Sequence, residues 1–243
     1  GVTTITTLTL STSLLEIGVD AFKDCDNLYS VFIPDNVTTI GIGAFADCDK
    51  LVSITSANNS DYATEDGVLY DIKGATATLL QYPAGRPDFG FDITSPISAK
   101  NVAAVAERAF EGNKYLLSIN FDNNVTTVGE KAFFNYQSLA RVIFDTGVTN
   151  IGANAFTYNG TGNGTLAHAT FLGNQPGSIG STPFAKAAST FEVRFIQGST
   201  GFTAPTWTTP VPDTYNSRII RQTTNGELTY RIKAGSVGFC RSE

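Results

Sequence analysis

The sequence predicts an α/β solenoid, a right-handed superhelix of stacked repeats with a parallel β-sheet along one side. Three observations lead to this fold class. The chain repeats itself with a period of about 23 residues. Each repeat carries an apolar pattern typical of a short strand, and the middle of the chain holds an insertion that contains the pattern of a β-hairpin.

The period is clearest in two similar stretches. "VTTIGIGAFADC" begins at Val37, and "VTTVGEKAFFNY" begins at Val125. An apolar residue, a Gly and an Ala-Phe pair recur in both. The Ala-Phe pairs are Ala21-Phe22, Ala44-Phe45, Ala109-Phe110, Ala132-Phe133 and Ala155-Phe156, and Phe184 keeps the Phe position after five extra residues. A single repeat length therefore accounts for both halves of the chain.

A second pattern, L-x-x-L-x-L, lies between the Ala-Phe pairs. Its apolar residues alternate in the second half, which indicates a strand with one face inward. A self-repeating unit of this length with this pattern is a leucine-rich repeat. The matching sets are Leu28/Val31/Ile33, Leu116/Ile119/Phe121, Leu139/Val142/Phe144 and Leu166/Ala169/Phe171, with Ile5/Leu8/Leu10 at the front and a shorter Leu51/Ile54.

Each repeat is too short to bury its own apolar face, so it is stable only when its neighbours stack on it. We expect equivalent side chains to form continuous columns in one shared interior. The Gly residues that follow the apolar column position suit a turn with positive φ or a close backbone approach. The predicted aromatic column consists of Phe22, Phe45, Phe110, Phe133 and Phe156.

Three segments also carry a specific resemblance. "IGVDAFKDCDNLYSVFIPDNV", "IGIGAFADCDKLVSIT" and "VGEKAFFNYQSLARVIFDTGV" resemble the BspA-type leucine-rich repeats of bacterial and protist surface proteins. "TEDGVLYD" and "ATATLLQYPAG" resemble the hairpin segment of that family, and "FLGNQPGSIGSTPF" and "GSTGFTAPTW" resemble its last coil and end. The resemblance implies a curved solenoid, displayed on a cell surface or secreted, that acts in adhesion or protein recognition rather than in catalysis.

Two domains follow from these patterns. Residues 1–210 are the predicted solenoid, with an insertion at about 56–101, and residues 211–243 are a β-hairpin that caps the stack or begins another module. The absence of Met and of a signal-peptide pattern leads us to expect a processed or trimmed piece of a longer protein. Within the insertion, residues 68–70 and 79–82 flank a turn, and residues 91–93 supply another solenoid strand.

The residues between the inward positions of each strand form the predicted outer face of the sheet, which is rich in hydroxyls and poor in carboxylates. We call a subset of them the candidate binding face, in which Phe32 and Ile143 are the apolar anchors. A face selected only for β-propensity is the alternative. The full outer face comprises Thr7, Thr9, Ser30, Phe32, Ser53, Thr55, Ser118, Asn120, Arg141, Ile143, His168, Thr170 and Arg194. The candidate binding face comprises Ser30, Phe32, Thr55, Asn120, Arg141, Ile143, His168 and Thr170.

The sequence gives little support for catalysis, for metal binding or for phosphate binding. His168 is the sole histidine, and no nucleophile motif accompanies it, so we expect an ordinary face residue, no catalytic residue and no cofactor.

Cys25 and Cys48 are one repeat apart and close enough for a disulfide, although buried free thiols are the favoured interpretation. The acidic residues beside these cysteines would line up along one edge of the stack, where a solvated edge is favoured over a Ca²⁺ site. The sequence "NGTGNGT" predicts a surface loop and lacks the Lys-Ser/Thr of a phosphate loop.

Composition narrows the possible partners. The net charge of −6 disfavours nucleic acid and anionic membranes, and no apolar run is long enough to span a bilayer. The leading hypothesis is a non-enzymatic module at the cell surface or secreted, which binds an extracellular or host protein or a glycan. A structural spacer that holds other domains away from the surface is the main alternative, and a polysaccharide-acting solenoid enzyme is the third. The ligand and the oligomeric state are not predicted.

Overall fold

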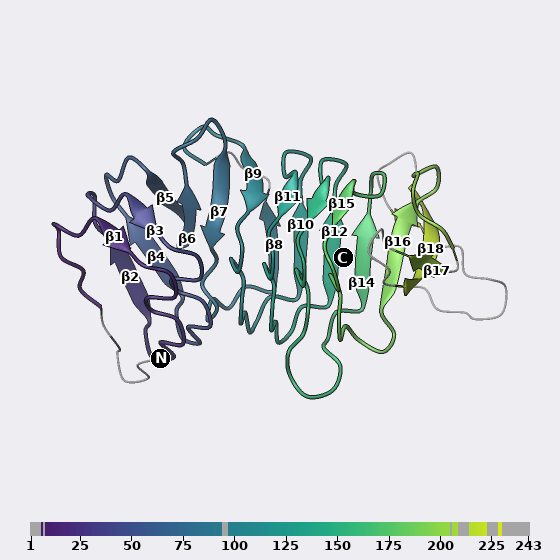
Figure 1. The fold of residues 1–243 in the computed structure, drawn as a ribbon, viewed down its shortest axis with the longest axis horizontal. Helices are drawn as coiled ribbons and strands as arrows, with labels where there is room; N and C mark the ends of the chain where they lie inside the picture. Colours follow the sequence, from purple (N-terminus) through teal and green to yellow (C-terminus); the bar gives the residue numbers. More distant parts are fainter. Residues whose placement is uncertain are drawn as a thin grey trace.

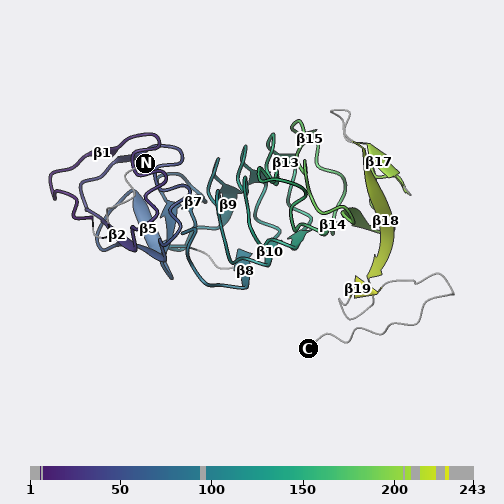
Figure 2. The same cartoon turned by 90° about the horizontal axis from the view of Figure 1, so that it is seen from below.

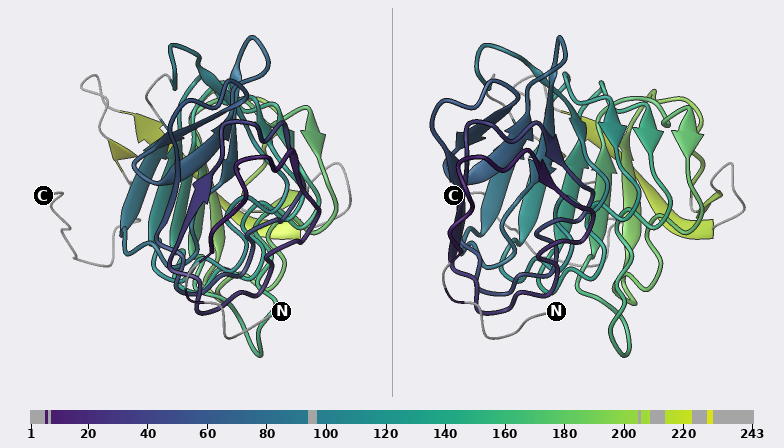
Figure 3. Two further views of the ribbon diagram at one scale, coloured as in Figure 1. Left: turned by 90° about the vertical axis from the view of Figure 1, so that its left-hand side faces the viewer. Right: turned by 60° about the vertical axis from the view of Figure 1, so that its left-hand side comes forward.

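The computed structural model describes residues 6, 8–93, 97–204, 206–208, 214–222 and 228–229. These residues form one elongated solenoid whose coils stack along the long axis (Figure 1). Figure 3 looks closer to that axis and shows successive coils overlying each other. Within the described residues, no helix is long and apolar enough to cross a membrane.

Each regular coil contributes one strand to each of two rows. The first row holds β2 (Ser30–Ile33), β4 (Ser53–Ser56), β8 (Gly90–Ile93), β10 (Ser118–Phe121), β12 (Arg141–Phe144), β14 (His168–Phe171) and β16 (Glu192–Ile196). The second row holds β1 (Glu16–Ile17), β3 (Thr39–Ile40), β7 (Ala77–Gln81), β9 (Val102–Val105), β11 (Thr127–Val128), β13 (Asn150–Ile151) and β15 (Ser178–Ile179). Neighbouring strands within a row pair in parallel where they are hydrogen-bonded. Ser118 is opposite Arg141, and Thr127 is opposite Asn150, so both rows confirm the period of 23 residues.

The arcs between the rows contain no helix in the described part of the chain, so the α component of the predicted fold is wrong. Their backbone N–H groups alternate between the same arc and the next coil: Ala132 donates to Gly129, and Phe133 donates to Ala155. Positive φ values interrupt any helical run. They recur before the Ala-Phe pairs and two residues after them. The residues before the pairs are Asp20, Gly43, Arg108, Lys131 and Asn154, and those after them are Asp24, Asp47, Gly112 and Asn135.

The predicted small residue at the start of each arc is explained by close packing. A Cβ on Gly129 would lie 2.5 Å from the backbone nitrogen of Glu107, and one on Gly152 would lie 2.4 Å from that of Glu130. Both distances are shorter than any van der Waals contact, so a side chain here would push adjacent coils apart. Gly is required at these positions for close approach rather than for positive φ.

The aromatic column is confirmed within each half of the molecule. Phe133 stacks on Phe110 at 4.3 Å and on Phe156 at 4.8 Å between ring centroids, and Phe184 continues the stack. The expectation of one shared interior is wrong, however. Phe45 belongs to an N-terminal cluster of residues 17–69, whereas Phe133 belongs to a cluster that extends from Val68 to Phe195.

The insertion separates these two clusters. The predicted pairing of residues 68–70 with residues 79–82 is confirmed as β6 (Val68–Asp71) antiparallel to β7, and β5 (Tyr62–Glu65) extends the hairpin on the other side. β6 is buried on both faces, with Leu69 in the N-terminal cluster and Val68 and Tyr70 in the larger one. β8 pairs with β10, as expected for an additional solenoid strand.

Three further strands lie at the C-terminal end of the solenoid, as Figure 2 shows. β18 (Thr214–Gln222) pairs in parallel with β16 and antiparallel with both β17 (Thr206–Thr208) and β19 (Leu228–Thr229). The antiparallel pairing of β18 and β19 fits the hairpin predicted for residues 211–243. Asn225 and Gly226, an Asn-Gly pair typical of the turn of such a hairpin, lie outside the described residues. The division at residue 210 into a solenoid and a cap or further module stays a prediction.

Candidate binding surface

The candidate binding face is divided between two sheets. Three of its residues lie on the two-stranded sheet β2–β4, and five lie on β10, β12 and β14 of the eight-stranded sheet. The hairpin strands β5 and β6 lie against β4, and the Ile54 N–H donates to the Gly67 carbonyl oxygen at 2.9 Å. The insertion therefore occupies the place where the sequence pattern alone predicts a continuous surface. The N-terminal residues are Ser30, Phe32 and Thr55, and the others are Asn120, Arg141, Ile143, His168 and Thr170.

The N-terminal part of the face is open to solvent. Ser30, Phe32 and Thr55 are all exposed, and the Phe32 side chain keeps 49% of its surface accessible. Phe32 lies opposite Thr55 and Ser30 lies opposite Ser53 in the parallel register. An aromatic ring thus stands among hydroxyl groups on an exposed strand face. This arrangement combines an apolar contact area with hydrogen-bonding groups, as recognition surfaces do.

The other part of the face is more enclosed. Ile143 is half-buried, and the amide of Asn120 donates to the carboxylate of Asp92 on the adjacent strand. Thr170 was expected to face solvent, but it is 3% exposed, so this expectation is wrong. It lies between Ile143 and Arg194 in the sheet register, and these longer side chains limit its access to solvent. Arg141 remains exposed.

His168 takes part in a polar network across β14 and β16. Its Nε2 lies 3.1 Å from Nη2 of Arg194, whose Nε donates to Glu192 at 3.0 Å. A guanidinium group donates and never accepts, so Nε2 of His168 is the acceptor and its proton is on Nδ1. The ring is therefore oriented by its contact with Arg194. This network accounts for the sole histidine as an element of the sheet surface.

The two cysteines of the N-terminal coils are buried free thiols, as favoured from the sequence. The Cys48 thiol donates to the carbonyl oxygen of Phe22 at 3.0 Å. Burial raises the pKa of Cys48 to about 12. A thiol with that pKa carries almost no thiolate at neutral pH, so Cys48 is a poor nucleophile. Cys240 lies outside the described residues.

A group of charged residues, which we call the charged junction, connects the arcs on either side of the insertion. Lys23 lies 2.8 Å from Glu111 and 3.3 Å from Asp47, Arg108 binds Glu111, and Arg108 also lies 2.7 Å from Asp20. Glu111 is buried, with 4% of its surface exposed. The junction brings together residues that the insertion separates in the chain. Sequence patterns missed it because the repeat period does not continue through that insertion.

Asp47 and Glu111, two carboxylates of the charged junction, have pKa values that are shifted in opposite directions. Burial, and then the negative charge of Glu111, raises the pKa of Asp47 to about 6. Burial would also raise the pKa of Glu111, but hydrogen bonds and charges from Arg108 and Lys23 outweigh it and lower that pKa. Across the described residues, no group of three or more His, Cys, Asp or Glu side chains is placed to hold a metal ion. The junction is an ion-pair network in which the two cations face the carboxylates.

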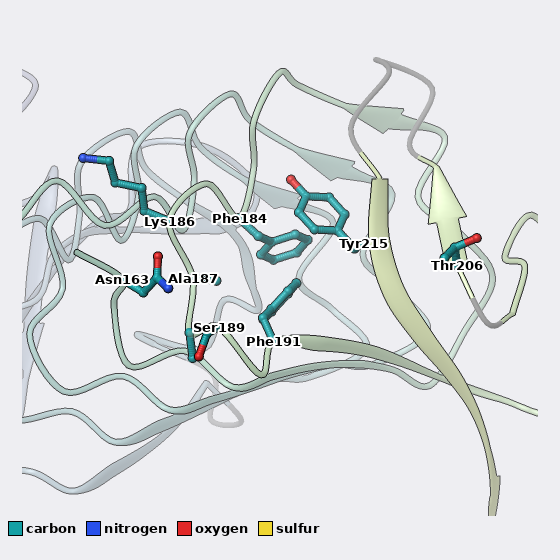
Figure 4. A pocket seen from close by; sticks show the side chains of 9 residues that line it. Asn163, Phe184, Lys186, Ala187, Ser189, Phe191, Thr206 and Tyr215 are labelled. Atoms are coloured by element: carbon teal, nitrogen blue, oxygen red, sulfur yellow. The ribbon is translucent and has the colours of Figure 1, made fainter.

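A pocket of about 370 Å³ lies at the C-terminal end, between the last coil and β18 (Figure 4). Phe184, Phe191 and Tyr215 form its aromatic wall, with ring centroids 5.1 to 5.6 Å apart. Phe184 is the last ring of the aromatic column, and Tyr215 meets it edge to face. The pocket is therefore the end of the repeat interior rather than an independent cleft. Asn163, Lys186, Ala187, Ala188, Ser189 and Thr206 complete the lining.

Several exposed apolar residues were not predicted as candidates. Phe89 is 69% exposed and Leu117 is 43% exposed, and the Leu117 N–H donates to the Phe89 carbonyl oxygen. Tyr29, at 62% exposed, immediately precedes β2. All three directly precede a first-row strand. Alternation of inward and outward side chains holds only within a strand, so it does not predict the exposure of residues just before one.

The chain is similar to known proteins in sequence and in fold. A family model described as "BspA type Leucine rich repeat region" matches residues 1–70 and 90–200 in six copies. No curated protein sequence matches significantly. A crystal structure of a leucine-rich cell surface protein from Faecalibacterium prausnitzii is 25% identical with a TM-score of 0.58, and covers 79% of this chain and 54% of that one.

Two other solved structures are similar. A leucine-rich repeat protein from Eubacterium ventriosum is 26% identical with a TM-score of 0.59, and covers 75% of this chain and 46% of that one. The pneumococcal vaccine antigen PcpA, at 23% identity and a TM-score of 0.65, shares the fold, over 75% of this chain and 42% of that one. The chain thus spans about half the length of these proteins or less. Because the family model matches both halves of the solenoid on either side of the hairpin, the chain belongs to the BspA-type leucine-rich repeat family.

Proposed function

We propose that this chain is a non-enzymatic binding module at the cell surface or in a secreted protein, and that it recognises an extracellular or host protein or a glycan. The family and the cell-surface description of the similar Faecalibacterium prausnitzii protein support the location. The described residues supply no clustered acid, base and nucleophile that would favour catalysis. His168, the only histidine, is already held by Arg194.

The N-terminal sheet β2–β4 is the part of the candidate binding face that carries the function in this proposal. The observation that carries this proposal is the exposure of the Phe32 side chain, which keeps 49% of its surface accessible on a regular strand. The hydroxyls of Ser30, Ser53 and Thr55 surround it in register. Covering the exposed half of such a ring in a complex is worth roughly 0.7–1.5 kcal/mol, and truncation of an aromatic anchor at the centre of an interface costs about 2 kcal/mol or more. The enclosed residues around Thr170 and His168 offer much less free contact area.

Binding can be tested with the purified chain against arrays of matrix proteins and glycans. We expect specific and saturable binding that falls roughly 10–100-fold when Phe32 is replaced by Ser. Phe89→Ser is the matched control, because Phe89 is also an exposed phenylalanine but lies outside the candidate binding face. Ile143→Ser tests the second anchor, and its half-buried position predicts a smaller effect on binding.

The melting temperature of each variant separates lost contacts from lost folding. Saturable binding that is unchanged by Phe32→Ser would remove the N-terminal sheet from the proposal. The complete absence of saturable binding would instead favour the spacer function. That alternative is supported by the elongated shape of the solenoid (Figure 1), in which the coils stack along one axis.

A further inference from the structure

The loop between β13 and β14 carries a reactive sequence that the proposed function does not use. It contains the five residues added to the regular repeat, and it holds two Asn-Gly pairs, Asn159-Gly160 and Asn163-Gly164. Both asparagines are exposed. A glycine after asparagine places no side chain near the asparagine amide, so the backbone can approach it closely.

We propose that Asn159 is a site of spontaneous intramolecular deamidation, whereas Asn163 is protected. The backbone nitrogen of Gly160 attacks Cγ of Asn159, an N–Cγ bond forms, and the Cγ–Nδ2 bond breaks. The leaving amide nitrogen takes up the proton lost by the Gly160 N–H and departs as ammonia. Water then opens the cyclic imide at either carbonyl, which yields an aspartyl or isoaspartyl residue with one new negative charge.

The two pairs differ in the hydrogen bonding of the attacking nitrogen. The Gly164 N–H donates to the carbonyl oxygen of Lys186 at 2.7 Å, so this nitrogen must first lose a hydrogen bond. The Gly160 N–H finds no acceptor within the described part of the chain. Its nitrogen therefore has no hydrogen bond to lose before it attacks. Local opening is an additional barrier for Asn163 alone.

The surroundings of Gly160 also favour the product. The ammonium group of Lys186 donates to the Gly160 carbonyl oxygen at 3.4 Å, so a positive charge lies beside the modified residue. A carboxylate formed near an ammonium group is stabilised by their attraction. The Tyr158 N–H donates to Ala185 at 3.1 Å and holds the chain just before the loop. The change therefore affects an anchored surface loop without disturbing the aromatic column.

The test uses the chain produced in a bacterium without N-glycosylation, because both asparagines precede a Gly-Thr pair and a glycan would block them. After incubation of the folded protein in mildly alkaline buffer, peptide mapping locates each gain of about 1 Da. Mapping is needed because Asn225-Gly226 is a third Asn-Gly pair. Asn159 should convert about fivefold faster than Asn163, the effect of one ordinary hydrogen bond.

Two controls make the result decisive. In denaturant the rates at Asn159 and Asn163 should converge, because the protecting hydrogen bond is lost. Asn159→Gln should remove the first product and leave the rate at Asn163 unchanged. Equal rates in the folded protein, or faster conversion at Asn163, would overturn the proposal. Neither outcome bears on ligand binding, so this inference stands or falls separately from the proposed function.

Discussion

The regular coils formed by residues 102–195 and the region around the insertion are held together in different ways. In the regular coils, parallel strand pairs, arc hydrogen bonds and stacked phenylalanines recur at every interface. At the insertion, side chains replace part of this backbone pairing. The Tyr62 hydroxyl accepts from the Ile40 N–H at 2.9 Å, and Asn59 donates to the carbonyl oxygens of Pro34 and Val37. The same contacts therefore join each pair of neighbouring regular coils, whereas the contacts around the insertion depend on particular side chains.

The difference also concerns the interior. Strand β6 is buried on both faces and separates the N-terminal cluster from the larger one. Repeat proteins are stabilised by contacts between nearest neighbours, so an interruption divides the stack into parts with different stability. We expect the N-terminal cluster of residues 17–69 to unfold more easily than the larger cluster. Three measurements test this comparison.

The largest effect is expected within the regular stack. Phe133→Ala removes a ring that is 1% exposed and stacked on both Phe110 and Phe156. The free energy of unfolding should fall by about 3–5 kcal/mol, measured by denaturant titration. Phe22→Ala is the comparison, because Phe22 is half-buried and, among the residues that the structure describes, stacks on one phenylalanine, Phe45. Equal losses for the two variants would contradict the division into a strong stack and a weaker end.

An intermediate effect is expected at the charged junction. Glu111→Gln leaves the cations of Arg108 and Lys23 without their buried counter-charge. We expect a loss of about 2 kcal/mol, below the usual cost of breaking a fully buried pair because Lys23 is partly exposed. Glu130→Gln is the control, because the Glu130–Lys131 pair is largely solvent-exposed and should contribute little. A junction that does not stabilise the chain would show the same small loss in both variants.

The smallest effect is a dependence of stability on pH. The pKa of Asp47 is about 6 in the folded protein, above its unfolded value of about 3.9. Folded Asp47 therefore holds its proton more tightly, so its stabilisation is complete below the unfolded pKa and is lost as pH rises through about 6. We expect the free energy of unfolding to rise by about 1–2 kcal/mol from pH 7.5 to pH 5 because of this group.

Glu111 has the opposite sign, because its folded pKa is lowered. Its stabilisation is complete above its unfolded pKa of about 4.3 and is lost as pH falls through its folded pKa. Chemical denaturation across this range should thus show a maximum at about pH 4, where the gain from Asp47 is nearly complete and the loss from Glu111 has begun. Asp47→Asn should abolish the rise between pH 7.5 and pH 5 and leave the loss of stability below about pH 4 that belongs to Glu111. A rise that persists in Asp47→Asn would assign it to another group.

The structural role of some residues follows directly from the sequence. The Ala-Phe pairs predicted the aromatic column, since a strict spacing can recur only if equivalent residues share equivalent environments. The hairpin and the parallel first-row strands followed from alternating apolar residues. The arcs were different. The positive φ values of Asp20, Lys131 and Asn154 were not predicted, because Asp, Lys and Asn carry no requirement for that conformation.

The candidate binding face illustrates a similar limit. Alternation identified Phe32 and Thr170 as equivalent outward residues, yet Phe32 is open and Thr170 is buried. Exposure depends on the lengths of the neighbouring side chains, which belong to other repeats. The face was also expected to be continuous, although the position of β5 and β6 against β4 divides it. No local pattern specifies where an insertion packs.

The order of amino acids is sufficient to derive the repeat, its strands, the aromatic column within each half and the presence of a hairpin, because these depend on nearest-neighbour stacking at a fixed period. Three-dimensional packing was needed for the remaining features: the absence of a helix in the arcs, the two separate interiors and the charged junction of Lys23, Asp47 and Glu111. These features arise from contacts between residues far apart in the chain, and their energies depend on burial and on neighbouring charges that no single repeat contains.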